Sequence, residues 1–402
     1  MKIAFYHNLP SGGGKRAMLE MARGLASGHE IDEYTLTTSN KSFCDLTPFI
    51  QARFEYPFIP SRTFGSPLGR LNTAMRSIDF RRLDQLQRSI GEEIDKKKYD
   101  VVFVNHCHFT QSPLILNHLR TPTVYYCAEP PRFLYEPRVS RPYNQLSKFR
   151  MMLDRIDPFI QIFRRRMRIL NEKAAQKATL VLTNSAFSRE NLYRVFGVNA
   201  RICYLGVNTD RFAKQDLAKK NFVISVGAAH PGKGFDFLVK SVGCLPEAIR
   251  PDIILVSNYA ENNEKGYLNQ IANEARVNLE FRSMVSDEEL VQLYNQALLT
   301  VYTPIMEPFG FVPIESMACG TPVIGIREGG VRESVIHFRN GLLIDRDEDS
   351  FVNAYQTITS NPSLYQELSR NGLQDSVTLW KWETCIQNLE KFFVQAMELR
   401  HV

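Results

Sequence analysis

The chain has 402 residues, of which 44% are hydrophobic and 23% charged, a balance typical of a globular protein long enough for two domains. No apolar run reaches the roughly eighteen residues that a membrane-spanning helix needs, and the N-terminal stretch has too short an apolar core for a signal peptide. Seven scattered cysteines without a Cys-x-x-Cys pair favour a reducing cytoplasm over a disulfide framework or a zinc site.

The net charge of +6 is unevenly distributed. Residues 1–200 contain 30 Lys and Arg against 18 Asp and Glu, whereas residues 201–402 contain 19 against 25. The densest basic stretch, residues 148–170, reads KFRMMLDRIDPFIQIFRRRMRIL. Two interpretations stay open: a solvated helix face, or a surface attracted to anionic lipid head groups or an acidic acceptor. No nucleic-acid motif accompanies the charge, so a nucleic-acid partner is not expected.

Short β-rich runs alternate with helical patterns from the first residues onward. Strands are predicted at 2–7 and 29–36, on either side of a helix over 14–27 whose apolar residues recur at spacings of three and four. Further strands are predicted at 99–106, 121–127 and 178–185. This alternation implies an α/β fold with a parallel sheet and helices on both faces.

The alternation pauses over the polar residues 204–221 and then restarts. The later strands are predicted at 222–227, 251–258, 278–283, 299–304 and 321–326, and the helices between them at 235–245, 264–275, 286–297 and 312–320. We therefore predict two Rossmann-like domains with a hinge between them. The predicted ranges are 1–205 for the first domain, 206–220 for the hinge, 221–375 for the second domain and 376–402 for a C-terminal helix crossing back to the first.

The glycine-rich stretch SGGGKR, residues 11–16, looks at first like a phosphate-binding loop. A Walker loop requires Gly-x4-Gly-Lys-Ser/Thr, but Leu9 stands five residues before Gly14 and Arg16 follows Lys15. A dinucleotide loop fails as well, because its third glycine should lie three residues after the second. The stretch is therefore interpreted as the first strand-to-helix turn of the N-terminal domain.

The stretch EPFGFVPIE, residues 307–315, sets two carboxylates around a predicted helix start. Glu307 follows a strand, Pro313 suits the opening of a helix, and Glu315 lies in or just after the first turn. Free N–H groups at a helix start attract diphosphate, and a nearby carboxylate can bind ribose hydroxyls. The alternative is a pair of surface glutamates that stabilise the helix dipole.

Several motifs together resemble the family 4 glycosyltransferases, which are retaining enzymes of the GT-B fold. The segment YTPIMEPFGFVPIESMACGTPVIGIREGGVRESV is similar to the Glu-x7-Glu region of that family. GGGKRAMLEMARGLASGHEIDEYTL, LVLTNSAFSRENLYRVFGVNARICYLGVNTDRF, SVGAAHPGKGFDFLVKSV and FRSMVSDEELVQLYNQALLTVYTP follow the family's order. YYCAEPPRFLYEP is similar to a branch that includes O-antigen mannosyltransferases. The resemblance implies two Rossmann-like domains whose parallel sheets face a central cleft.

The resemblance also implies a donor site on the second domain. Glu315 would bind the ribose hydroxyls of a nucleotide sugar, and Glu307 a hydroxyl of the transferred sugar. Gly310 and Phe311 would offer backbone N–H groups to that sugar. Lys233 would neutralise the diphosphate, which gains negative charge as the glycosidic bond breaks.

The chain departs from the family at a residue that usually binds the diphosphate. Ala228 stands five residues before Lys233, where the family usually has an arginine, and alanine cannot replace a bidentate guanidinium. His230, Arg327 and Arg332 are candidates for compensation. A second departure is Ser257-Asn258 in place of a Gly-x-Gly turn.

Five residues of the first glycine-rich turn and of a strand end are expected to face the substrates. Gly12 and Gly13 match the family's glycine pair, which lets the backbone approach the donor. Lys15 is a further candidate for the compensating cation. His106 and His108 lie at the carboxyl end of the strand predicted at 99–106, where the family often has a histidine that contacts the sugar, and His106 is slightly favoured.

Two charged residues of the segment YCAEPPRF, Glu129 and Arg132, are candidates for acceptor or donor contact. The alternative interpretation of this pair is a salt-bridged loop.

These features lead to the prediction of a retaining, metal-independent hexosyltransferase without a cofactor. GDP-mannose is the favoured donor and a UDP-hexose the next, and the acceptor would be a saccharide or lipid-linked saccharide in surface polysaccharide synthesis. We expect same-face attack, with the departing phosphate accepting the proton of the acceptor. The expected location is the cytoplasm, peripheral to the inner face of the plasma membrane.

Other classes fit the motifs less well. A GT-B epimerase lacks the EPFG…E arrangement, and a phosphorylase would need a pyridoxal lysine and a longer chain. A non-catalytic or weakly active sugar-nucleotide-binding protein in a glycan-assembly complex remains the alternative, supported by the missing arginine.

Overall fold

A computed structural model describes residues 1–39, 43–65, 71–144 and 157–399. It divides into two compact units. The N-terminal unit comprises Met1–Arg138, Leu146–Tyr204 and Cys385–Val402, and the C-terminal unit comprises Val139–Gln145 and Leu205–Thr384. The expected N-terminal domain, 1–205, therefore includes a short segment, 139–144 in the described chain, that is part of the other unit. Periodicity could not show this, because the segment is only a few residues long.

Within the described residues, the N-terminal unit holds a seven-stranded parallel sheet in the order β3-β2-β1-β4-β5-β6-β7. Its strands are β1 (Lys2–Asn8), β2 (Glu30–Leu36), β3 (Ala52–Tyr56), β4 (Val101–Cys107), β5 (Thr123–Tyr126), β6 (Leu180–Thr183) and β7 (Arg201–Ile202). The strand order reverses between β1 and β4. Ligands of such doubly wound sheets bind outside the carboxyl ends of the strands at this switch point.

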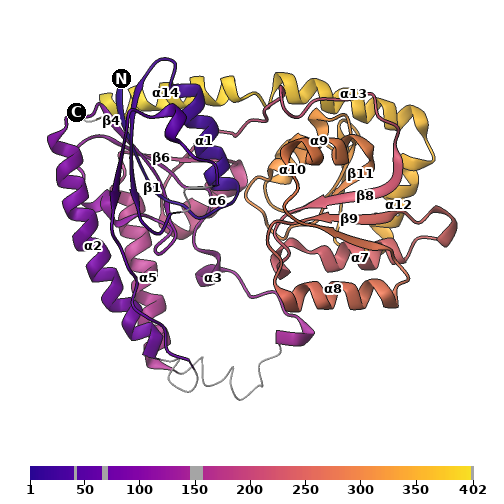
Figure 1. Ribbon diagram of the computed structural model, residues 1–402, viewed down its shortest axis with the longest axis horizontal. Coiled ribbons are helices and arrows are strands. Elements are labelled where there is room, and N and C mark those ends of the chain that lie inside the picture. The colour runs from indigo at the N-terminus through magenta and orange to yellow at the C-terminus, as the bar shows by residue number, and fades with distance from the viewer. Residues whose placement is uncertain (40–42, 66–70, 145–156, 400–402) are drawn as a thin grey trace. The chain divides into compact units, whose positions relative to one another are not determined.

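Helices cover both faces of this sheet (Figure 1). They are α1 (Gly13–Leu25), α2 (Asn72–Lys96), α3 (Arg132–Tyr135), α5 (Pro158–Lys177), α6 (Ala186–Phe196) and most of α14 (Trp382–Glu398), with short 3-10 turns η1 (Thr47–Phe49) and η3 (Leu114–Asn117). Burial of the central strands on both faces explains their nearly continuous apolar sequences.

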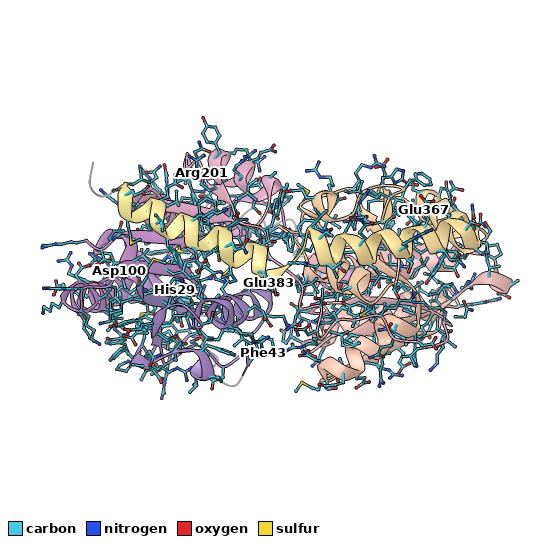
Figure 2. All side chains as sticks on the ribbon, turned by 90° about the horizontal axis from the view of Figure 1, so that it is seen from above. His29, Phe43, Asp100, Arg201, Glu367 and Glu383 are labelled. Atoms are coloured by element: carbon cyan, nitrogen blue, oxygen red, sulfur yellow. The ribbon has the colours of Figure 1, made fainter. Side chains whose placement is uncertain are left out.

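The C-terminal helix α14 packs on the N-terminal unit. The Nε2 of His29 lies 2.8 Å from Oε1 of Glu390, and Figure 2 labels His29 beside this helix. Gly24 of α1 lies so close to Ile386 that a Cβ on Gly24 would overlap the isoleucine side chain. The glycine therefore permits the close approach of the two helices.

In the described part of the C-terminal unit, a six-stranded parallel sheet runs in the order β10-β9-β8-β11-β12-β13. The strands are β8 (Lys220–Val226), β9 (Asp252–Val256), β10 (Leu279–Arg282), β11 (Ala297–Tyr302), β12 (Val323–Ile326) and β13 (Gly341–Ile344). The switch point here lies between β8 and β11.

The helices of this unit are α7 (Phe235–Gly243), α8 (Asn262–Glu274), α9 (Asp287–Gln296), α10 (Phe311–Ala318), α11 (Val331–Ser334), α12 (Glu348–Thr359) and α13 (Pro362–Thr378). Short 3-10 turns are η4 (Pro142–Asn144), η5 (Pro231–Lys233) and η6 (Glu247–Ile249). Helices α7 and α8 lie on one face of the sheet and α9 and α10 on the other (Figure 1).

The predicted α/β class and two parallel sheets are confirmed. Every strand and helix that the sequence pattern predicted is present, with ends that differ by a few residues. No helix in the described residues combines the length and the apolar character needed to cross a membrane. Residues 148–156 of the basic stretch lie outside the described chain, whereas 158–177 form α5.

Candidate active site

Two candidate donor residues meet at the switch point of the C-terminal sheet. Lys233 lies in η5, which follows β8, and Glu307 lies in the loop after β11. The Nζ of Lys233 donates a hydrogen bond to Oε1 of Glu307 over 2.9 Å, and both side chains remain partly exposed. The sequence separates these residues by more than seventy positions, and the adjacency of β8 and β11 brings them together.

The turn that carries Lys233 is tightly held by its neighbours. His230 caps the turn, because its Nδ1 accepts the Gly232 N–H at 3.1 Å. The Thr303 hydroxyl donates to the Lys233 carbonyl at 2.8 Å, and the Ile305 N–H donates to the Gly232 carbonyl at 2.9 Å. This geometry gives His230 a capping role, and its expected contact with the donor stays a prediction.

The loop that carries Glu307 rests on two consecutive glycines. The N–H of Gly330 donates to the Glu307 carbonyl over 2.8 Å. A Cβ on Gly329 would overlap the Glu307 carbonyl oxygen, and a Cβ on Gly330 would overlap that of Pro308. The GG of REGGVRES therefore has a structural role that the motif alone did not reveal: it lets the Glu307 loop lie against the start of α11.

Gly310 and Phe311 form the start of α10. Gly310 is the N-cap with φ of +93°, and a Cβ there would overlap the Tyr302 hydroxyl, so any larger residue would displace the helix start. The Phe311 ring lies 6.3 Å from that of Trp382, and the Phe309 ring 5.6 Å from that of Trp380. These aromatic contacts fix the loop between β11 and α10.

Glu315 is only 3% exposed, in the second turn of α10. The Tyr294 hydroxyl of α9 donates to its Oε2 at 3.0 Å, which orients the carboxylate. Sequence reasoning missed Tyr294, because a tyrosine in an amphipathic helix is usually a core residue. The hydrogen bond gives it a direct part in holding a candidate donor residue.

Two candidates for the missing arginine have other contacts. The Nη2 of Arg327 donates to the Leu343 carbonyl at 2.9 Å, and the Nε of Arg332 donates to the Gly329 carbonyl at 2.9 Å. Both guanidinium groups thus support backbone segments. Another arginine, Arg346, pairs with Glu328 at 2.8 Å.

The switch point of the N-terminal sheet brings His106 to the glycine-rich turn. His106 lies at the end of β4, and an added Cβ on Gly14 would lie 3.2 Å from Cε1 of His106. Burial, with smaller contributions from the charges of His7 and His108, lowers the pKa of His106 to about 4. The imidazole is therefore neutral near pH 7 and suited to hydrogen bonding with a hydroxyl.

His108 lies two residues further on and is exposed, with its ring 5.6 Å from that of Phe109. Gly12 is the N-cap of α1 with φ of +138°, and a Cβ there would meet no atom within 4 Å. Gly13 begins the helix. The chain thus leaves space at Gly12 beside the helix start, and the approach of a donor to this turn stays a prediction.

Lys15 corrects one expectation, because it is not presented to solvent. Its side chain is 2% exposed, and its Nζ lies 3.3 Å from Nε2 of His7 and 3.8 Å from Oε1 of Glu33. Burial lowers the pKa of Lys15. Burial would raise the pKa of Glu33, but hydrogen bonds and charges from His7, Arg53 and Lys15 outweigh it and lower the pKa to about 2. Lys15 therefore balances an internal carboxylate.

Glu129 and Arg132 lie together near the start of α3. The Nε of Arg132 is 3.8 Å from Oε2 of Glu129 and 2.7 Å from Oε2 of Glu136. This arrangement matches the salt-bridged loop that the sequence analysis left open, and contact with a substrate stays a prediction. In the described ranges no cluster of three or more His, Cys, Asp and Glu is placed to hold a metal ion.

Comparisons with known proteins match both units. A family model described as Glycosyltransferase Family 4 matches residues 11–211, half of the chain, and one described as Glycosyl transferases group 1 matches residues 207–375. A probable sucrose-phosphate synthase from Thermosipho melanesiensis is 29% identical over 56% of this chain and 56% of its own. Mannosylfructose-phosphate synthase from Agrobacterium fabrum is 26% identical over 59% of this chain and 57% of its own. The chain thus spans little more than half the length of these relatives.

Solved structures are similar over nearly the whole chain. The sucrose-phosphate synthase of Thermosynechococcus elongatus has a TM-score of 0.75 at 18% identity and covers 99% of both chains. The Anabaena protein HepE, in complex with UDP, has a TM-score of 0.71 at 18% identity and covers 98% of this chain and 100% of its own. At these identities the likeness concerns the fold, which is GT-B.

Proposed function

Because this chain belongs to the family 4 glycosyltransferases, we propose that it transfers a hexose from a nucleotide sugar to a saccharide or lipid-linked saccharide acceptor. The observation that carries the proposal is the Lys233–Glu307 pair at the switch point between β8 and β11. A cation and a carboxylate 2.9 Å apart suit the two ends of a sugar diphosphate. Lys233 would take the diphosphate and Glu307 a hydroxyl of the sugar.

Binding of the donor would replace the contact between Lys233 and Glu307 by a contact of each residue with the donor. In its absence Lys233 and Glu307 neutralise each other, and a bound diphosphate would attract the ammonium while the sugar hydroxyl donates to the carboxylate. As the glycosidic bond breaks, negative charge grows on the leaving diphosphate, and the ammonium stabilises it. Glu315, held by Tyr294, would bind the ribose. We propose retention by same-face attack, without a metal ion, with the departing phosphate accepting the proton of the acceptor.

We propose two candidate donors, in order of preference. The sequence resemblance to O-antigen mannosyltransferases supports GDP-mannose. HepE, of the same fold, has been solved with UDP and with UDP-glucose, which supports a UDP-hexose as the second choice.

Thermal-shift and transfer assays with GDP, UDP and ADP sugars test the proposal. A donor present at about one hundred times its dissociation constant stabilises the protein by roughly 2.7 kcal/mol through mass action. The proposal requires one class of donor to raise the melting temperature and to be turned over, and Lys233→Ala to abolish both effects. Binding without turnover with every acceptor tried would favour the non-catalytic alternative, which Ala228 supports. Formation of the inverted anomer would refute the retaining mechanism.

We also propose that α5 contacts an anionic membrane surface. Arg164, Arg165, Arg166 and Arg168 are exposed on this helix. Exposed apolar side chains accompany them, with Phe159 and Ile162 each 52% exposed. Basic and apolar residues together favour adsorption to anionic lipid.

Co-sedimentation with phosphatidylglycerol and phosphatidylcholine vesicles tests this surface. The R164Q/R165Q/R166Q variant should lose binding to the anionic vesicles. A matched K240Q/R370Q/K391Q variant removes as many exposed charges elsewhere and should retain it. Equal losses in both variants would show a nonspecific charge effect and contradict the proposal.

A further inference from the structure

A short segment from the first half of the chain is built into the C-terminal unit. Residues 139–144, which include η4, belong to this unit together with 205–384. In Figure 1 the segment is the magenta turn beside α8. Its central residue, Arg141, is only 5% exposed. A charged side chain so deeply buried requires partners for its whole guanidinium group.

Arg141 bridges the starts of two helices and η5, the turn that carries Lys233. This turn is called the donor turn below. Its Nε lies 3.0 Å from Oε2 of Glu264, and its Nη2 lies 3.0 Å from Oε1 of that carboxylate and 2.8 Å from Oδ1 of Asp236. The same Nη2 donates to the Pro231 carbonyl at 3.1 Å. Glu264 is fully buried and also accepts a hydrogen bond from the Tyr143 hydroxyl. The planar guanidinium of arginine can donate to several acceptors in this way, which lysine cannot reproduce.

Three successive carbonyls of the donor turn are thereby held by two different segments. Arg141 holds the Pro231 carbonyl, the Ile305 N–H holds that of Gly232, and the Thr303 hydroxyl holds that of Lys233. The two latter donors come from the loop after β11. Only the Pro231 carbonyl is held by a residue from the first half of the chain.

Arg141 also fixes the helix that follows the donor turn. Asp236 lies in the first turn of α7, which begins directly after Gly234, and Glu264 lies in the first turn of α8. Carboxylates at these positions are stabilised by the helix dipoles and present their oxygens to the guanidinium. The turn is thus held at Pro231 before Lys233 and at Asp236 after it.

We propose that Arg141 is a positioning residue for the donor diphosphate. By holding the backbone on both sides of Lys233, it fixes the direction in which the ammonium is presented. The proposal rests on the function proposed above for Lys233. Arg141 acts on the diphosphate through that lysine and has no part in recognising the base. Its loss should therefore weaken binding of a nucleoside diphosphate and leave the corresponding nucleoside unaffected.

Calorimetric or NMR titration of the full chain tests this separation. The probes are GDP and UDP with guanosine and uridine, and the pair whose diphosphate binds the wild-type protein is used. Arg141→Lys is the main variant, because it keeps a cation beside Glu264 and so preserves the fold. We expect its dissociation constant for the diphosphate to rise about tenfold, a free-energy change of about 1.4 kcal/mol, with less than a twofold change for the nucleoside.

Two control variants make each outcome decisive. Arg138→Lys changes an exposed arginine close to the segment and should alter neither constant. Equal weakening of diphosphate and nucleoside in Arg141→Lys, or no weakening at all, would overturn the inference in favour of a purely structural ion pair. If Lys233→Ala leaves diphosphate binding intact, the proposed function of Lys233 is wrong. If Lys233→Ala weakens it and Arg141→Lys does not, only the role of Arg141 is wrong.

Discussion

The carboxylate of Glu315 is buried and accepts a hydrogen bond from the Tyr294 hydroxyl of α9. Its Oε2 accepts the Tyr294 hydroxyl at 3.0 Å, and the residue is 3% exposed. A buried carboxylate oriented in advance can accept two hydroxyls without first reorganising its surroundings. The contribution of Tyr294 is therefore indirect: it sets the orientation, and Glu315 would make the contact.

Two variants separate these contributions. Glu315→Gln removes the charge that would accept the ribose hydroxyls, so the donor affinity should fall roughly tenfold to a hundredfold. Tyr294→Phe leaves the carboxylate charged but less well oriented, and its effect should be smaller. Titration with the donor nucleotide measures both. Near-normal donor affinity in Glu315→Gln would contradict the assignment of the site.

Individual site residues differ in how far sequence could predict them. Lys233, Glu307 and Glu315 were identified from motifs, but their mutual contacts depend on which strands are neighbours. Lys15 shows the limit most clearly. A lysine after three glycines suggests an open cation, yet the first turn of α1 directs it toward Glu33 on the adjacent β2. No local pattern signals that partner.

At the scale of elements, close backbone contacts position the Glu307 loop. Gly330 lies against Pro308, where an added Cβ would overlap the carbonyl oxygen. Gly330→Ala must therefore displace either the loop or the start of α11. We expect a loss of about 1–3 kcal/mol in the free energy of unfolding, together with reduced turnover, because Glu307 moves with the loop.

Gly266→Ala is the matched control for this change. Gly266 lies within α8, and an added Cβ would meet no atom within 4 Å. Alanine there should stabilise the helix by about 0.5–1 kcal/mol and leave turnover unchanged. Urea denaturation and a donor-turnover assay measure both variants. Equal stability of the two would show that the Glu307 loop tolerates displacement.

Sequence periodicity predicted the elements that have strong apolar patterns. The central strands of both sheets are buried on both faces, which leaves unbroken apolar runs such as VVFV and IILV. It gave no prediction for β3, whose residues are mostly half-buried, or for α2, whose 25 residues are largely polar with one buried stripe. Elements with less of their surface covered carry a weaker apolar signal.

At the scale of the whole molecule, the N-terminal unit should be the more acid-sensitive part. Burial lowers the pKa of His7 and brings that of His106 to about 4, whereas both titrate near 6.5 in an unfolded chain. The unfolded state then binds protons that the folded unit does not. Stability is therefore complete above about pH 6.5 and falls as the pH drops toward 4. The low pKa of Glu33 keeps its pairs intact until the pH approaches about 2.

Hydrogen exchange followed by mass spectrometry checks this expectation. Between about pH 7.5 and pH 5, after correction for intrinsic rates, β1, β2 and β4 should lose more protection than β8, β9 and β11. His106→Gln should reduce that loss, by about 1–2 kcal/mol of opening free energy. A uniform loss across both units would contradict the prediction.

The burial of Arg141 has a consequence for anyone who dissects this protein. The C-terminal unit is not one continuous stretch of sequence, because residues 139–144 complete it. A fragment cut at 205–384 would lose Arg141 and Tyr143, the two partners that the segment gives to the Glu264 carboxylate, and with them the contact between α7 and α8 that Arg141 makes. We expect such a fragment to be unstable alone and to be rescued by adding a synthetic peptide that spans 136–144. Glu264→Gln in the fragment should remove most of this dependence on the peptide. The stability of the fragment would then measure what the missing segment contributes.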